Sequence, residues 1–164
     1  MRGEQFDPLR ALRVLVDRGA RFVVIGGFAA ALRGSPLLTG DLDICYARDE
    51  ANLEAVAAAM RELSATLRGA PPGLPFRLDA TSLSNGDRFT FSTAAGPVDI
   101  LGAPAGTSGF ADLNRDATDE DVDGVKVRVA SLDDLIRMKD AAGRVKDRLG
   151  LEWLAALKEE LDQG

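Results

Sequence analysis

Two aspartates separated by a single residue, Asp41 and Asp43, are the residues of this sequence best suited to chemistry. They open the segment 41–46, where charged and apolar residues alternate before an apolar run, a pattern that predicts a β-strand. Residues two apart in a strand project to the same face, so the two carboxylates would repel each other across about 6–7 Å. A divalent cation relieves this repulsion, and carboxylate oxygens suit Mg²⁺ or Mn²⁺. An isolated Asp-x-Asp is nevertheless more often a solvated strand start.

A pair of glycines, Gly26 and Gly27, directly follows the apolar run 21–25, which predicts a buried strand. Residues 28–33 are rich in alanine and predict a short helix. Glycines let backbone N–H groups approach a phosphate, and the N-terminus of a helix favours negative charge. Alone, the pair is explained by a tight turn. Together, the glycines and the acids lie at the ends of two successive strands, the arrangement that nucleotidyl transfer needs if the strands are neighbours.

The composition narrows the chemistry further. The sequence has no histidine, which excludes Ser-His-Asp and Cys-His catalysis and zinc sites that contain histidine. Its net charge of −6 argues against broad adhesion to nucleic acid. The single cysteine, Cys45, lies in an apolar strand and is interpreted as a small buried hydrophobe. We find no signal-peptide core and no apolar run long enough to cross a bilayer, and we expect a cytoplasmic protein that does not bind membranes.

The remaining elements predict an α/β (α+β) fold in which helices flank a mixed sheet. We expect one domain over residues 1–164, with C-terminal helices from about residue 131. Helices are expected from Asp7-Pro8 to Gly19, over 49–68, over 110–115, from Ser131 to Gly143, and finally one carrying Trp153, Leu154, Leu157 and Leu161. Further strands are expected over 76–79, 88–92 and 98–101, followed by a hairpin over 122–129.

These motifs resemble a known family. The pair Gly26-Gly27, followed by Leu38-Thr-Gly-Asp-Leu-Asp-Ile44, is similar to the signature of the DNA polymerase β-type nucleotidyltransferase superfamily. In that superfamily a later strand supplies a third acid. Asp99, within Gly96-Pro-Val-Asp-Ile-Leu101, matches it in pattern, and Asp79 is a weaker competitor. The segments Ser131–Lys139 and Ala141–Asp147 resemble the C-terminal part of small nucleotidyltransferases related to the AbiEii toxins of type IV toxin–antitoxin systems.

The resemblance implies the nucleotidyltransferase fold and a role for each matching residue. Asp41, Asp43 and Asp99 would bind Mg²⁺ or Mn²⁺, and Asp99 would accept the proton of the attacking hydroxyl. The nucleotide would contact a set of backbone and cationic groups: Gly26, Gly27, Thr39, Lys139, Arg144 and Lys146. The implied reaction transfers a nucleoside monophosphate from an NTP to a hydroxyl acceptor, which for a toxin-like member would be tRNA, with an antitoxin protein as partner. The sequence departs from many relatives in lacking a basic residue beside Thr39.

Two alternatives stay open at the level of sequence. The chain could be a non-catalytic module that keeps the fold and binds a nucleotide or a partner. It could also be an α/β domain in which the motif is fortuitous, and in that case the three aspartates would not converge in space. The cations of the 139–148 segment alternate with aspartates, so a solvated helical face explains them as well as a nucleotide site does.

Overall fold

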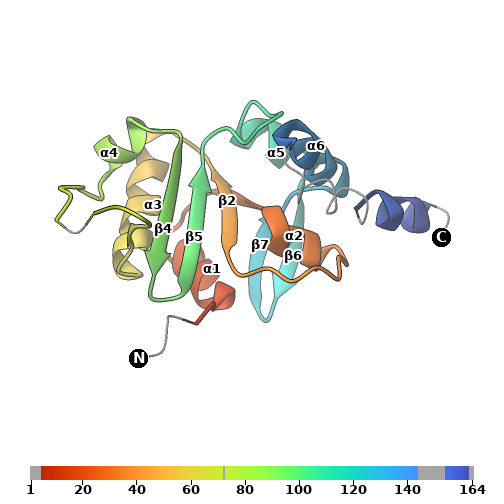
Figure 1. The fold of residues 1–164 in the computed structure, drawn as a ribbon, viewed down its shortest axis with the longest axis horizontal. Coiled ribbons are helices and arrows are strands. Elements are labelled where there is room, and N and C mark those ends of the chain that lie inside the picture. Colours follow the sequence, from red (N-terminus) through yellow and green to blue (C-terminus); the bar gives the residue numbers. More distant parts are fainter. Residues whose placement is uncertain (1–4, 72, 144–153, 163–164) are drawn as a thin grey trace.

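In the part of the chain that the structure describes, seven strands form one mixed sheet. They are β1 (Phe22–Ile25), β2 (Leu42–Tyr46), β3 (Thr66–Leu67), β4 (Arg88–Thr93), β5 (Gly96–Leu101), β6 (Thr118–Val122) and β7 (Val125–Val129). Their order across the sheet is β3-β4-β5-β2-β1-β7-β6 (Figure 1). The pairs β2–β5 and β1–β7 are parallel, and the other neighbours are antiparallel. The structure is a computed structural model that describes residues 5–71, 73–143 and 154–162. The predicted mixed α/β fold is confirmed.

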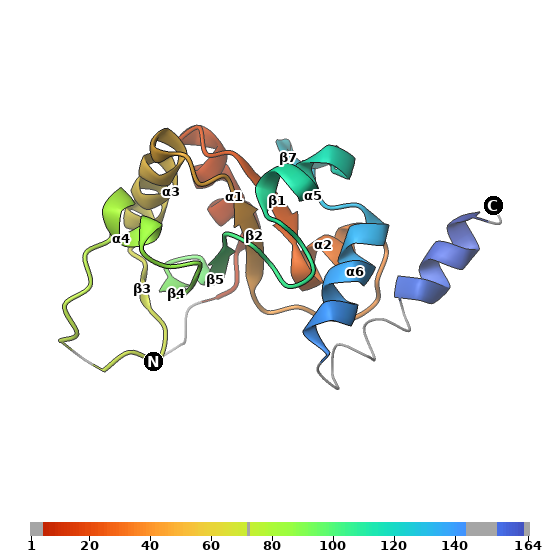
Figure 2. The ribbon, with the colours of Figure 1, turned by 90° about the horizontal axis from the view of Figure 1, so that it is seen from above.

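The helices that accompany the sheet up to residue 143 are α1 (Pro8–Asp17), α2 (Gly26–Leu32), α3 (Glu50–Glu62), α4 (Ala80–Ser84), α5 (Phe110–Asp116) and α6 (Leu132–Ala142). Residues 154–162 are also helical. Figure 1 shows α1 and α3 behind the sheet and α2 in front of it. Seen from above, α6 and the helix of residues 154–162 lie at one end of the molecule and α4 at the other (Figure 2). Within the described residues, no helix combines the length and apolar character that a bilayer crossing requires.

The helix ends follow from local capping. Asp7 accepts a hydrogen bond from the backbone N–H of Arg10, and Pro8 occupies the first helical position of α1. Ser131 caps α6 by accepting from the backbone N–H of Asp134. Gly143 ends α6 in the left-handed conformation that glycine tolerates. The predicted starts of α1 and α6 are therefore confirmed.

The predicted helix over 49–68 is wrong in its last turn. Helix α3 ends at Glu62, and Ser64 takes a φ of 55°, which breaks the helical path. The chain then forms the short strand β3 against β4. The apolar residues Leu63 and Leu67 continue the helical spacing but serve two different elements.

Two other boundaries also differ from the expectation. Helix α2 begins at Gly26 rather than Phe28, so both glycines belong to its first turn. The strand expected over 76–79 is not formed. Phe76 instead packs against Phe89 at a ring-centroid distance of 6.1 Å, and Asp79 caps α4. An aromatic contact and a helix cap thus replace the backbone pairing that the apolar run suggested.

Candidate active site

A single cross-strand row brings two of the three predicted acids, Asp43 and Asp99, together. The register pairs Ile25 with Asp43, Asp43 with Asp99, and Asp99 with Thr90. The backbone N–H of Arg68 donates to the carbonyl of Thr90 at 2.8 Å, which adds Arg68 to the same row. Paired residues of neighbouring strands project to the same face of a sheet. We call Arg68, Thr90, Asp99, Asp43 and Ile25 the charged row.

The three carboxylates are close enough to share one ion. One oxygen each of Asp41, Asp43 and Asp99 lies within 4.8 Å of the others. Oxygen atoms that ligate one Mg²⁺ at about 2.1 Å sit at comparable separations from each other. The donor set consists only of carboxylate oxygens, which favours a hard divalent cation. The geometry therefore fits Mg²⁺ or Mn²⁺.

Asp43 carries the strongest sign of an incomplete site. Its Oδ1 atom is buried and has no hydrogen-bond partner among the described residues. Burial, together with the negative charges of Asp41 and Asp99, raises the pKa of Asp43 to about 7, although the Arg88 guanidinium opposes the shift. A buried carboxylate oxygen without a donor is costly unless a cation or a proton reaches it. A divalent cation among the three carboxylates would satisfy this oxygen.

The first glycine is required by its closeness to Asp43. Gly26 has a φ of +71°, and a Cβ built on it would lie 2.9 Å from Cβ and Cγ of Asp43 and would collide with its Oδ2 atom. No side chain caps α2, whose N-cap is Ile25. The second glycine touches another predicted residue: a Cβ on Gly27 would lie 3.0 Å from Oγ1 of Thr39. The glycine pair thus lets the start of α2 approach both Asp43 and Thr39.

Two adjoining cavities meet at the acids. The larger, of about 490 Å³, is lined mainly by the 35–41 loop, α2 and the three aspartates. The smaller, of about 140 Å³, is mostly apolar and lies between β1, α6 and the loop after β5. Asp43, Arg88 and Lys139 line both of them. A polar chamber and an apolar one therefore join beside the carboxylates.

The other predicted residues fall into three groups. Thr39 donates a hydrogen bond to the carbonyl of Asp41 at 3.1 Å and lines the larger cavity, while Lys139 reaches both cavities from α6. Asp79 caps α4 by accepting from the backbone N–H of Ser82 at 2.9 Å, away from the charged row. Arg144 and Lys146, as well as Trp153, lie outside the described residues.

Sequence reasoning missed two arginines beside the acids. Arg68, which follows β3, forms an ion pair with Asp99. Arg88, the first residue of β4, lines both cavities. The alternation of Arg88, Phe89, Thr90 and Phe91 places Arg88 and Thr90 on one face, and that signal was available in the sequence. No comparable signal marked Arg68, because it was assigned to a helix.

The buried thiol has no place in this chemistry. Cys45 lies in β2 beyond Asp43, is fully buried, and donates weakly to the carbonyl of Gly102 at 3.6 Å. Burial raises the pKa of its thiol to about 12, so it stays protonated at neutral pH. The interpretation of Cys45 as a small buried hydrophobe agrees with this environment.

Comparison with known proteins identifies solved structures with a similar fold. A scan against protein-family models gives no match, and a search of curated proteins gives none either. Three solved structures are similar to this chain. The first is a candidate nucleotidyltransferase of Thermotoga maritima, with 21% identity, a TM-score of 0.56, and coverage of 98% of each chain.

The other two structures belong to antibiotic-resistance proteins. The lincosamide antibiotic adenylyltransferase LnuA, with lincomycin bound, matches at a TM-score of 0.60 with 12% identity, over 92% of this chain and 95% of that one. The resistance factor ANT(2'')-Ia, studied in solution, matches at 0.52 with 14% identity, over 95% and 89%. The chain therefore has the fold of these nucleotidyltransferases along nearly its whole length.

Proposed function

We propose that this protein is a metal-dependent nucleotidyltransferase that moves a nucleoside monophosphate from an NTP to a hydroxyl acceptor. The observation that carries the proposal is the convergence of Asp41, Asp43 and Asp99 within 4.8 Å on the wall of a cavity that Gly27 and Thr39 also line. Its fold is that of nucleotidyltransferases, which supports the same chemistry. The cavity of about 490 Å³ lies within the usual range for small-molecule sites.

The reaction forms a bond between the acceptor oxygen and the α-phosphorus and breaks the bond from that phosphorus to the bridging oxygen of the β-phosphate. Pyrophosphate leaves with the electron pair of the broken bond, and Asp99 accepts the proton of the acceptor hydroxyl. When bound, divalent cations neutralise the phosphates and lower the pKa of the acceptor hydroxyl. Asp41 and Asp43 would hold them, and Gly26 and Gly27 would contact the triphosphate from the start of α2. Lys139 lines the same cavity, which supports a contact between its ammonium group and a phosphate oxygen.

Two classes of acceptor, small molecules and tRNA, are supported by different observations. The neighbours LnuA and ANT(2'')-Ia are an antibiotic adenylyltransferase and an antibiotic-resistance factor, which supports a small hydroxylated molecule for this chain. The resemblance to AbiEii toxins supports tRNA, with an antitoxin as partner. The net charge of −6 disfavours extensive contact with RNA, so we rank the small molecule first.

The test is transfer of label from α-³²P NTPs in the presence of Mg²⁺, with panels of tRNA, protein and hydroxylated small molecules as acceptors. We expect labelling by the wild type and a loss of at least about 1,000-fold in Asp43→Asn, because the metal ligand and its charge are removed. Asp123→Asn, at the tip of the β6–β7 hairpin, is the matched control and should keep full activity. Labelling that persists in Asp43→Asn would refute the assignment.

A second function, a non-catalytic nucleotide-binding module, makes a different prediction in the same system. Calorimetry with each NTP, with and without Mg²⁺, would then show metal-dependent binding while no acceptor in the panel is labelled. The buried Oδ1 of Asp43, for which the described residues supply no hydrogen-bond donor, favours metal binding in both cases. Only turnover separates the two functions.

A further inference from the structure

Three cationic side chains surround the acids, and they differ in how they are engaged. Arg68 is held by its ion pair with Asp99. Lys139, on α6, also has an interaction of its own. For the guanidinium of Arg88, by contrast, the described residues supply neither a hydrogen bond nor an ion pair, and its marked effect among them is the electrostatic one on Asp43. Its guanidinium is therefore available to a ligand.

The backbone fixes where this guanidinium starts. Arg88 pairs with Leu101, the last residue of β5, and Leu101 lies two positions beyond Asp99. Arg88 is thus on the face of the sheet that carries the charged row, displaced by one repeat toward the loop after β5. The antiparallel pairing of β4 and β5 extends over the whole of both strands, so the anchor of this long side chain is rigid.

Its position coincides with the junction of the two cavities. Arg88 and Asp43 line both chambers, and Lys139 lines both from the opposite element, α6. A polyphosphate coordinated through a cation at Asp43 would share these cavities with Arg88 and Lys139. A planar guanidinium presents parallel N–H donors that match two phosphate oxygens, which an ammonium cannot do.

From these observations we propose that Arg88 is a substrate-binding residue that grips the polyphosphate of the nucleotide, and the pyrophosphate after transfer, opposite Lys139. The inference rests on the proposed function and adds to it a residue outside the recognised motif. The exposed first residue of β4 would then bind the nucleotide, whereas an arginine at the start of a strand commonly only contacts solvent. Arg68, being engaged with Asp99, is not expected to share this role.

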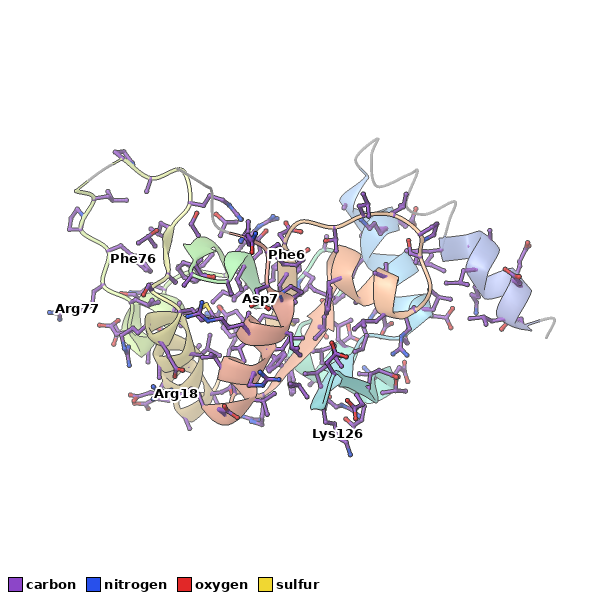
Figure 3. The ribbon with its side chains drawn as sticks, turned by 90° about the horizontal axis from the view of Figure 1, so that it is seen from below. Phe6, Asp7, Arg18, Phe76, Arg77 and Lys126 are labelled. Atoms are coloured by element: carbon purple, nitrogen blue, oxygen red, sulfur yellow. The ribbon has the colours of Figure 1, made fainter. Side chains whose placement is uncertain are left out.

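The experiment measures binding without turnover. Calorimetry on the full chain with Mg²⁺ would compare inorganic pyrophosphate and a nonhydrolysable NTP for the wild type, Arg88→Gln and Arg88→Lys. We expect Arg88→Gln to weaken both ligands about ten- to hundredfold, because charge-assisted hydrogen bonds are lost. Arg88→Lys should recover only part of the affinity, because it keeps the positive charge but lacks the parallel N–H donors of a guanidinium. Arg77→Gln is the charge-matched control: Arg77 is 87% exposed and points outward from its loop (Figure 3).

A second measurement, the affinity for Mn²⁺ without nucleotide, should increase in Arg88→Gln while the affinity for pyrophosphate decreases. Without nucleotide, Mn²⁺ should bind Arg88→Gln a few-fold more tightly than the wild type, because a positive charge beside Asp43 has been removed. A merely structural defect would weaken both Mn²⁺ and pyrophosphate. Wild-type affinity for pyrophosphate in Arg88→Gln, or an equal loss in Arg77→Gln, would overturn the role of Arg88 and leave the proposed function intact. If the wild type binds neither ligand with Mg²⁺, the proposed function fails as well.

Discussion

Two neighbouring cross-strand rows of the same sheet differ in almost every physical property. The charged row joins Arg68, Thr90, Asp99 and Asp43 to Ile25. One residue earlier on β2 and β5, and across to β4 and β3, the register aligns Leu42, Val98, Phe91 and Leu67, which we call the apolar row.

The difference lies in what each row leaves unsatisfied. Leu42, Val98 and Phe91 are fully buried in the core, and burial of apolar surface stabilises the fold. In the charged row, Asp43 keeps a buried oxygen without a donor among the described residues and a pKa raised to about 7. Because successive residues of a strand face opposite sides, the same strands can build a core on one face and a costly reactive site on the other. Stability and chemistry are therefore separated by a single residue step.

The largest expected contrast comes from putting the same side chain at adjacent positions. Leu42→Asn should lower the free energy of unfolding by about 3–5 kcal/mol, because it leaves a cavity and buries an amide. Asp43→Asn should raise it by on the order of 1–3 kcal/mol in metal-free protein at pH 8. The pKa of Asp43 is about 7 in the folded protein and 3.8 ordinarily, so at pH 8 its ionised carboxylate destabilises the folded state. Replacing it with a neutral amide removes this destabilisation. Urea unfolding measures both variants.

The opposite result for Asp43→Asn would break the contrast. If this variant destabilises the protein as much as Leu42→Asn does, the carboxylate contributes to the fold, and the separation of the two rows is wrong. Mn²⁺ supplies an internal check, since it should stabilise the wild type but not Asp43→Asn.

A smaller effect is expected where the helix start meets the charged row. Gly26→Ala should cost about 1–3 kcal/mol of stability and weaken Mn²⁺ binding about tenfold, because the new methyl group would displace the Asp43 carboxylate. Gly19→Ala is the matched control, since Gly19 has a φ of +77° and a methyl group added there would meet no atom within 4 Å. It should show the backbone strain without the metal defect. Equal Mn²⁺ affinity in the two variants would show that Asp43 does not bind the ion.

The last expected effect is a change of metal affinity with pH. A cation must displace the proton of Asp43, so Mn²⁺ affinity should rise up to about tenfold per pH unit below pH 7 and level off above it. Calorimetry between about pH 5.5 and pH 8.5, conditions chosen to bracket the pKa of about 7, would follow the change and the accompanying proton release. A flat profile across this interval would contradict the raised pKa of Asp43.

Much of this arrangement could be predicted from short segments of sequence. Local spacing identified the strand of Asp43 and the caps Asp7 and Ser131, because each depends on a few neighbouring residues, whereas Asp99 was singled out by the resemblance to a known family. It failed for β3, where Leu63 and Leu67 keep a helical spacing that Ser64 interrupts through its backbone. Pairing with β4, far along the chain, decides that segment.

The same limit applies to the two arginines. The position of Arg68 beside Asp99 depends on the order β3-β4-β5, which no local pattern encodes. Arg88 belonged to a correctly predicted strand, but its importance depends on the cavities formed by α2, α6 and the loop after β5. Residues whose role depends on partners distant in the sequence therefore cannot be predicted from each element alone.

The parallel pairing of β2 with β5 has a consequence for how the protein folds. Asp43 and Asp99 are adjacent in space but are separated in sequence by α3, β3, α4 and β4. The β4–β5 hairpin can form locally, whereas its docking on β2 requires closure of a long loop, and such non-local contacts form slowly. Docking also brings like charges together at neutral pH. Docking of the hairpin on β2 is thus the step that brings these candidate metal ligands together, and a divalent cation bound between them would speed that step.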